Sequence, residues 1–164
     1  VQSLDLSQNP LRSLKIDGRL FPQLKNIRLR LSQLEEIAIC NCSELATLSI
    51  DGNKRLFSFP FLPFLAETPQ LKYLTLCKNQ LRDTLTTEIF QLASRLRSFL
   101  VQDNQLRGTI DDTVVQLFQQ GALVDFSRNQ LHVDASPQFA NANAAFTNAN
   151  NAFIVMKDQA PPPL

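Results

Sequence analysis

Several residues of this chain have side chains that could take part in chemistry, but they do not form a catalytic arrangement. His132 is the only histidine, and no motif supplies a nucleophile for it, so a surface position is the simpler interpretation. Cys40 and Cys42 form a C-x-C pair, and no second ligand pair follows for a metal. Asp111 and Asp112 are typical of a helix cap at a turn. The sequence therefore predicts no catalytic residue, no metal site and no cofactor.

Composition excludes several classes of protein. The 164 residues include 16 basic and 15 acidic side chains, and the formal net charge is +1. This balance excludes a polybasic nucleic-acid binder and an acidic disordered chain. No apolar run reaches the roughly 18–20 residues that cross a bilayer, so we expect no direct membrane insertion. Three cysteines are too few for a disulfide scaffold, and the sequence contains neither common glycine-rich phosphate-binding string.

Leucine and asparagine, with 27 and 12 copies, recur at a regular interval. The string Asn-Gln-Leu occurs at residues 79–81, 104–106 and 129–131, and apolar residues stand three and five positions before each asparagine. The template L-x-x-L-x-L-x-x-N-x-L also fits around Asn9 and Asn53, and around Ser32 with serine in the asparagine position. Six units thus begin near residues 1, 24, 45, 71, 96 and 121. Their spacing matches the 20–29 residues of a known repeat class.

On these six units the sequence resembles the leucine-rich-repeat family, over about residues 1–135. The resemblance implies an α/β solenoid, a right-handed superhelix of about six coils. A short parallel β-sheet would form its concave face, and irregular or short helical segments its convex face. The connector at residues 106–117 is similar to that of the plant-type subclass, and residues 81–92 are similar with Asp83 in place of glycine.

Turn residues in the two plant-type connectors predict short helices on the convex side. Thr87 is expected to cap one of them. Asp111, Asp112 or Thr113 is expected to cap another, which ends at Gly121.

The asparagine position has a physical role that leucine cannot fill. Where the chain leaves each strand, backbone groups of neighbouring coils become buried and need hydrogen-bond partners, and an amide offers both donors and an acceptor. A buried unsatisfied group costs about 1–3 kcal/mol, which is enough to favour this residue type. Ser32 has only a hydroxyl, so we expect the second coil to be a weak point. The predicted structural ladder consists of Asn9, Ser32, Asn53, Asn79, Asn104 and Asn129.

Two segments depart from the repeat. Residues 34–44 restart the strand pattern too early for a new coil, so we assign them to the convex side of the second coil, with a second strand as one possibility. Residues 57–65 contain four phenylalanines and two prolines, which argue against a regular strand. One interpretation is a phenylalanine stack that fills the convex half of the third coil, and the other is an exposed apolar docking patch.

The two ends of the chain differ from the repeats. Val1 already occupies the first repeat position without a polar cap, so the chain is expected to be a fragment or a processed product. Residues 136–155 are interpreted as a degenerate C-terminal cap or a linker, with a phenylalanine-striped helix as an alternative. Residues 156–164 are expected to form an extended, proline-rich tail.

Side chains that point outward from the strands are the expected binding residues. They are small, polar and of mixed charge, unlike the one-sign field that binds a phosphate backbone. The leading hypothesis is therefore a non-catalytic module that binds a protein or peptide, and not nucleic acid, through the concave face. The predicted partner-binding residues are Arg28, Arg30, Asp51, Tyr73, Thr75, Leu100, Gln102 and Asp125.

Two other roles remain open at this point. The chain is alternatively a structural subunit of a larger assembly that uses its convex face, the phenylalanine-rich segment or the tail. An enzyme is compatible with the sequence only if catalysis lies in a domain outside it. The plant-type connectors favour a cell-surface or extracellular setting, whereas the free thiols favour an intracellular one.

Overall fold

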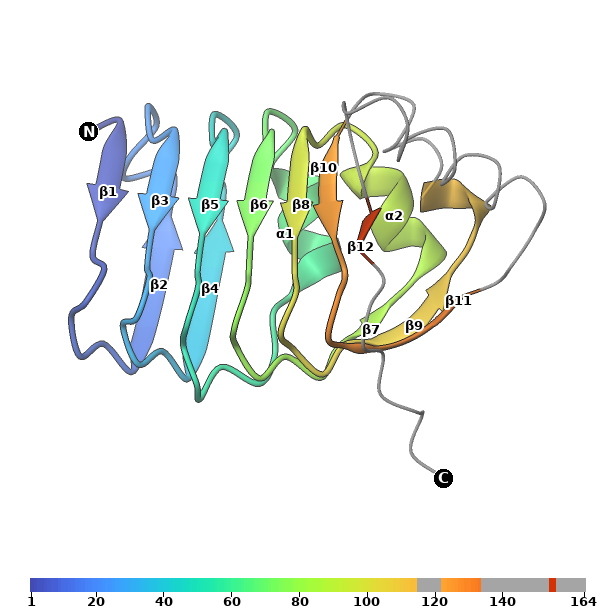
Figure 1. Ribbon diagram of the computed structural model, residues 1–164. Coiled ribbons are helices and arrows are strands. Elements are labelled where there is room, and N and C mark those ends of the chain that lie inside the picture. The colour runs from blue at the N-terminus through green and yellow to red at the C-terminus, as the bar shows by residue number, and fades with distance from the viewer. Residues whose placement is uncertain (115–121, 134–153, 156–164) are drawn as a thin grey trace.

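The computed structural model describes residues 1–114, 122–133 and 154–155 (Figure 1). The chain has a mixed α/β fold with a long parallel sheet and few helices. The predicted end of a helix at Gly121, and nearly all of the predicted cap and tail at 136–155 and 156–164, lie outside the described residues.

The long sheet contains seven strands, of which six come one from each predicted unit, and β12 lies outside these units. Its order is β1-β3-β5-β6-β8-β10-β12, every neighbouring pair is parallel, and equivalent residues pair in register, as Leu4 does with Ile27 and Leu74 with Phe99. Equivalent positions of successive units are thus paired across the sheet. The strands are β1 (Ser3–Asp5), β3 (Asn26–Arg28), β5 (Thr47–Ser49), β6 (Tyr73–Thr75), β8 (Ser98–Leu100), β10 (Leu123–Asp125) and β12 (Ile154–Val155).

A second layer lies behind the long sheet and closes the core between them (Figure 1). Near the N-terminus it consists of β2 (Ser13–Asp17) paired with β4 (Glu36–Cys40), which confirms a second strand in residues 34–44. Further along the chain it contains two helices, a 3-10 turn and a three-stranded parallel sheet. These elements are α1 (Phe61–Glu67), β7 (Thr84–Leu85), α2 (Thr87–Ala93), β9 (Arg107–Ile110), η1 (Asp112–Val114) and β11 (Gln130–Val133).

The phenylalanine-rich segment forms part of the core rather than a strand. Phe59 packs edge-to-face on Phe61 and Phe64, with ring centroids 5.0 and 5.1 Å apart, and all three are buried. Phe57 and Leu62 are exposed instead. The core-filling interpretation thus holds for three of the four phenylalanines, whereas helix α1 was not expected from the sequence.

Helix α2 begins one residue earlier than predicted. Its cap is Thr86, whose hydroxyl accepts from the N–H of Ile89, and not Thr87. The Thr87 hydroxyl instead donates to Asp111 at 2.8 Å. Of the three candidate caps further along, Asp111 accepts from the N–H of Thr113 at the start of η1.

Buried asparagines join successive units at the ends of the long-sheet strands. The Asn79 Nδ2 donates to the carbonyls of Ile50 and Leu76 at 2.7 and 2.9 Å, and its Oδ1 accepts from the N–H of Asn53 at 2.8 Å. Asn53, Asn104 and Asn129 make corresponding contacts. Each amide therefore satisfies backbone groups of its own unit and of the preceding one.

The first two ladder positions make fewer side-chain contacts between units. The Ser32 hydroxyl donates towards the carbonyls of Leu6 and Arg30, and so replaces the donor half of the amide. Asn9 is exposed, and its amide donates only to Leu6 and Ser7 within its own turn.

One residue before each ladder position has a left-handed backbone conformation. We call this set the left-handed row, and its φ angles lie between +53° and +73°. Only one member is a glycine, although a left-handed conformation costs other residues about 1–2 kcal/mol. The row consists of Gln8, Leu31, Gly52, Lys78, Asp103 and Arg128.

Gly108 has a separate steric reason to be glycine. It pairs with Leu85 across β9 and β7, and a Cβ atom at Gly108 would lie 2.3 Å from the Leu85 carbonyl oxygen. In the preceding unit Asp83 takes the corresponding position and accepts from the Ser58 hydroxyl and the Phe59 N–H at 2.8 and 3.0 Å.

The buried and exposed asparagines provide a matched pair of substitutions. Asn79→Ala leaves three buried backbone groups without their partner, so we expect a loss of about 3 kcal/mol or more in the free energy of unfolding. Asn9→Ala removes only exposed contacts and is expected to cost less than about 1 kcal/mol. Urea unfolding followed by circular dichroism measures both values. Equal losses would contradict the structural role of the buried amides.

Candidate functional site

The outward-pointing side chains of the long sheet form a continuous surface, which we call the outer face. Because the strands pair in register, equivalent positions of successive units lie side by side in columns. The inward neighbours Ile27, Leu48, Leu74, Phe99 and Val124 are completely buried, so the alternation expected from the sequence is present. The outer face is therefore held on a packed core.

A polar hollow of about 700 Å³ occupies the β1–β5 end of the outer face. Arg28, Arg30 and Lys78 line it together with Asp5 and Asp51, which gives three positive and two negative side chains. The Arg30 Nε lies 3.3 Å from the Asp51 carboxylate, whereas Arg28 has no carboxylate within 4 Å among the described residues. Arg28 is thus the predicted residue best placed to meet an incoming acidic group.

Asp51 is tied into the sheet more firmly than the other predicted contact residues. Its Oδ1 accepts from the N–H of Cys77 at 2.9 Å, and its Oδ2 accepts from the Ser49 hydroxyl at 3.0 Å. With Arg30 also in contact, both carboxylate oxygens already have partners. The main effect of Asp51 is to fix the position of Arg30.

Asp5 and Asp125 occupy the same position in the first and last described units. Each accepts from the N–H of the serine two residues later, Ser7 at 3.0 Å and Ser127 at 2.9 Å. The hydrogen bonds from Ser7, with Arg28 and other nearby cations, hold the pKa of Asp5 below its usual value. The Asp5 carboxylate is therefore charged beside the hollow at neutral pH.

The β6–β10 end of the outer face is more apolar. Tyr73 and Leu123 are 43% and 37% exposed, and the smaller Ser98 lies between them on β8. Leu100 follows two residues after Ser98 on the same face and is half-buried. These side chains form a shallow apolar area next to the polar hollow.

The remaining predicted positions are partly covered. Thr75 and Gln102 are half-buried, and the Gln102 side chain accepts from the Cys77 thiol at 2.9 Å. Cys77 and Ser127 also occupy outward positions of the repeat template, but both are buried.

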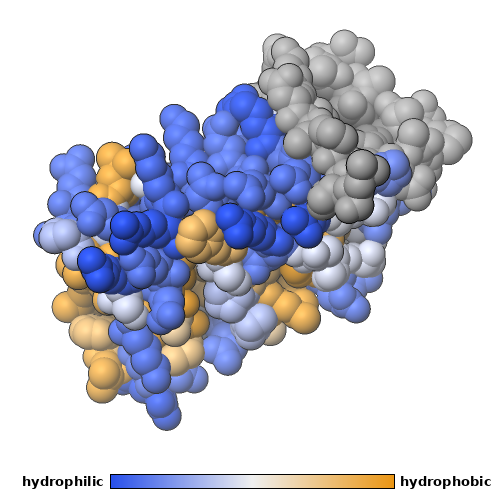
Figure 2. Space-filling view, turned by 90° about the horizontal axis from the view of Figure 1, so that it is seen from below, coloured by the Kyte–Doolittle hydropathy of each residue, from blue (hydrophilic) through white to orange (hydrophobic). Residues whose placement is uncertain are grey.

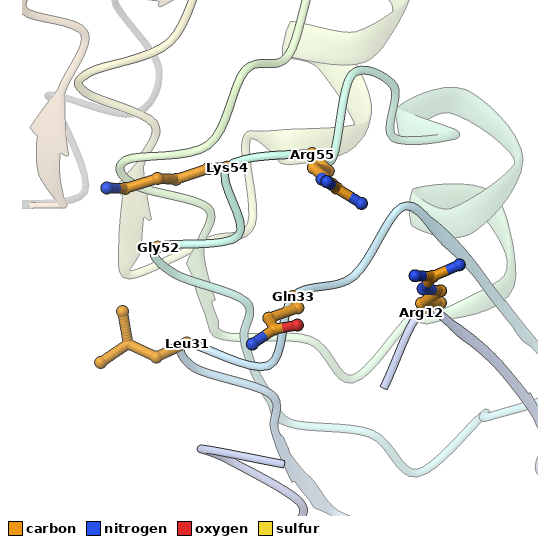
Figure 3. Close-up of a pocket in the computed structure, with 6 residues that line it drawn as sticks. All are labelled: Arg12, Leu31, Gln33, Gly52, Lys54 and Arg55. Atoms are coloured by element: carbon orange, nitrogen blue, oxygen red, sulfur yellow. The ribbon is translucent and has the colours of Figure 1, made fainter. Parts of the chain in front are cut away.

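A second hollow, of about 480 Å³, was not predicted. It is lined by Arg12, Leu31, Gln33, Gly52, Lys54 and Arg55 (Figure 3). These residues follow the strand ends of three successive units, and no single motif contains them. They are found only when the turns are placed above one another.

Among the described residues we find no further candidate for a catalytic or metal-binding site. No group of three or more histidine, cysteine or acidic side chains lies close enough to hold a metal ion there. His132 is exposed, as expected, and it lies on strand β11 rather than in a turn after Asn129. No helix among the described residues is long and apolar enough to span a membrane. No family model and no curated protein matches this sequence.

The three free cysteines should differ in reactivity. Burial and the Asp51 carboxylate raise the pKa of Cys77 to about 12, and burial with nearby Cys40 raises the pKa of Cys42. A raised pKa leaves the thiol protonated and unreactive at about pH 8. We expect iodoacetamide to modify half-buried Cys40 first, and the other two only after unfolding in urea, as read by peptide mass spectrometry. Equal labelling of Cys77 and Cys40 in the native protein would contradict this assignment.

Proposed function

We propose that this chain is a leucine-rich-repeat solenoid that binds a protein or peptide partner through the outer face of its long sheet. In this proposal the outer face is the concave surface, and the second layer is the convex side. The module has no catalytic function of its own.

Three features support the solenoid. Each sequence unit adds one parallel strand, the buried amides join each unit to the one before it, and the left-handed row repeats at the same interval. Gly108 stands where the plant-type connector has glycine, and the close approach of β7 explains why. Regular stacking of this kind is typical of repeat proteins, in which each unit contacts mainly its neighbours.

The observation that carries the binding proposal is the chemistry of the outer face. It places a polar hollow with Arg28 and Arg30 beside an apolar area with Tyr73 and Leu123. Protein partners offer both acidic and apolar side chains, and a rigid surface reduces the entropy lost on binding. The mixed charges are less suited to a nucleic acid, whose phosphates favour a field of one sign.

Selection from a displayed peptide library tests this proposal, because the library itself supplies candidate partners. Peptides enriched on the wild-type protein should bind Arg28→Ala/Tyr73→Ala at least about tenfold more weakly, since both areas of the outer face lose their main side chain. The matched control Arg107→Ala/Phe21→Ala removes a cation and an aromatic ring elsewhere. Isothermal titration calorimetry gives the affinities, and circular dichroism checks folding. Unchanged affinity in the first variant would reject the outer face.

A structural role in an assembly is the second candidate. The observation that favours it is the exposure of Phe57 and Leu62 on the second layer, at 46% and 43%. Arg82 lies over the Phe57 ring at 4.7 Å and covers part of it, which weakens this alternative.

Light scattering during size-exclusion chromatography separates the two candidates. A recognition module is expected to elute as a monomer near 18.5 kDa over a wide range of concentration. Regular oligomers that dissociate on Phe57→Ser/Leu62→Ser would favour assembly instead.

A further inference from the structure

The left-handed row forms the rim between the outer face and the turns below it. Five of its six members have side chains and Gly52 has none, and we call the rim at Gly52, where the end of the Leu31 side chain takes part of the space, the notch. Both hollows are lined by Leu31 and Gly52, which shows that they meet at this notch. A Cβ at Gly52 would lie 2.5 Å from the Leu31 Cδ2, so the glycine also leaves room for that side chain.

The hollow below the notch is strongly basic. Figure 3 shows Lys54 and Leu31 extending towards one end of it, and Arg12 and Arg55 at the other end, with Gln33 between them. Arg55 is paired with Glu35, 2.9 Å from Nη1 to Oε1. Among the described residues neither Arg12 nor Lys54 has a carboxylate within 4 Å. Two of the three cations are therefore available to a ligand.

The positive charge continues over the rim. Arg28, Arg30 and Lys78 line the hollow on the other side of the notch, so cations lie along a path from the outer face to the turns. Figure 2 views this side of the molecule and shows mainly hydrophilic residues along the middle of the stack. The exposed Leu31, at 59%, is an apolar contact in the middle of the path.

We propose that this path binds an extended, acidic peptide segment of the partner, which crosses the rim at Gly52 and places carboxylates near Arg12 and Lys54. This inference rests on the proposed function and extends the binding surface beyond the outer face. A peptide fits better than inorganic polyphosphate because Leu31 and Gln33 offer apolar and amide contacts beside the cations.

A fluorescein-labelled decaglutamate peptide is a suitable probe, with binding measured by anisotropy at low ionic strength. Arg12→Gln/Lys54→Gln should weaken binding about tenfold, since it removes the two cations of the hollow below the notch that have no carboxylate within 4 Å among the described residues. The control Lys15→Gln/Lys25→Gln removes the same charge away from both hollows and should change binding less than about twofold. All four residues are exposed, so the variants are expected to fold.

Filling the notch provides a test that leaves the charge unchanged. Asparagine tolerates the left-handed conformation, so Gly52→Asn adds a side chain at the rim, and its Cβ displaces the end of the exposed Leu31 side chain. It should weaken decaglutamate binding about fivefold with an unchanged circular dichroism spectrum.

Several results would overturn the inference. These are no binding of decaglutamate to the wild-type protein, equal losses in the two double variants, or no effect of Gly52→Asn. If Arg28→Gln weakens binding while Arg12→Gln/Lys54→Gln does not, the segment stays on the outer face and only the further inference fails. If inorganic polyphosphate binds more tightly than decaglutamate and also depends on Arg12 and Lys54, the path is a polyanion site and not a peptide site. The proposed function fails separately, if library peptides bind Arg28→Ala/Tyr73→Ala as tightly as they bind the wild-type protein.

Discussion

The buried amide at the end of each long-sheet strand is the interaction on which the rest of the structure depends. Asn79 contacts the backbone of two consecutive units through one side chain. Because both its donors and its acceptor are used, a shift in register by one residue would leave buried groups without partners. This requirement aligns the strands, and the alignment in turn produces the columns of the outer face.

The sequence was sufficient to predict six strands of the long sheet because their residue types are diagnostic. Apolar residues at alternating positions predict a half-buried strand, and the amide three residues later marks the turn that follows it. The left-handed row could not be predicted in the same way, since Leu31, Lys78 and Asp103 share a backbone conformation but no side-chain chemistry. Helix α1 was missed because the two prolines of residues 57–65 argued only against a strand, although proline is tolerated in the first turn of a helix.

The candidate sites likewise include residues that could be predicted from the sequence and residues that could not. Alternation predicted which side chains point away from the core, and Arg28, Tyr73 and Leu100 lie on the outer face. It could not predict that Cys77 is covered, which depends on the Gln102 side chain of the next unit. The basic hollow depends on turns from three units and on the absence of a side chain at Gly52.

The identical Asn-Gln-Leu strings also bear on how such a chain changes in length. They begin at Asn79, Asn104 and Asn129, and each amide donates to the equivalent carbonyl of the unit before it. A tandem duplication of residues 80–104 would thus insert a complete turn whose amide finds carbonyls to bind in its own unit and in the unit before it. Duplication of a segment between two of these strings keeps every contact between neighbouring units, whereas an insertion of any other length within a strand does not.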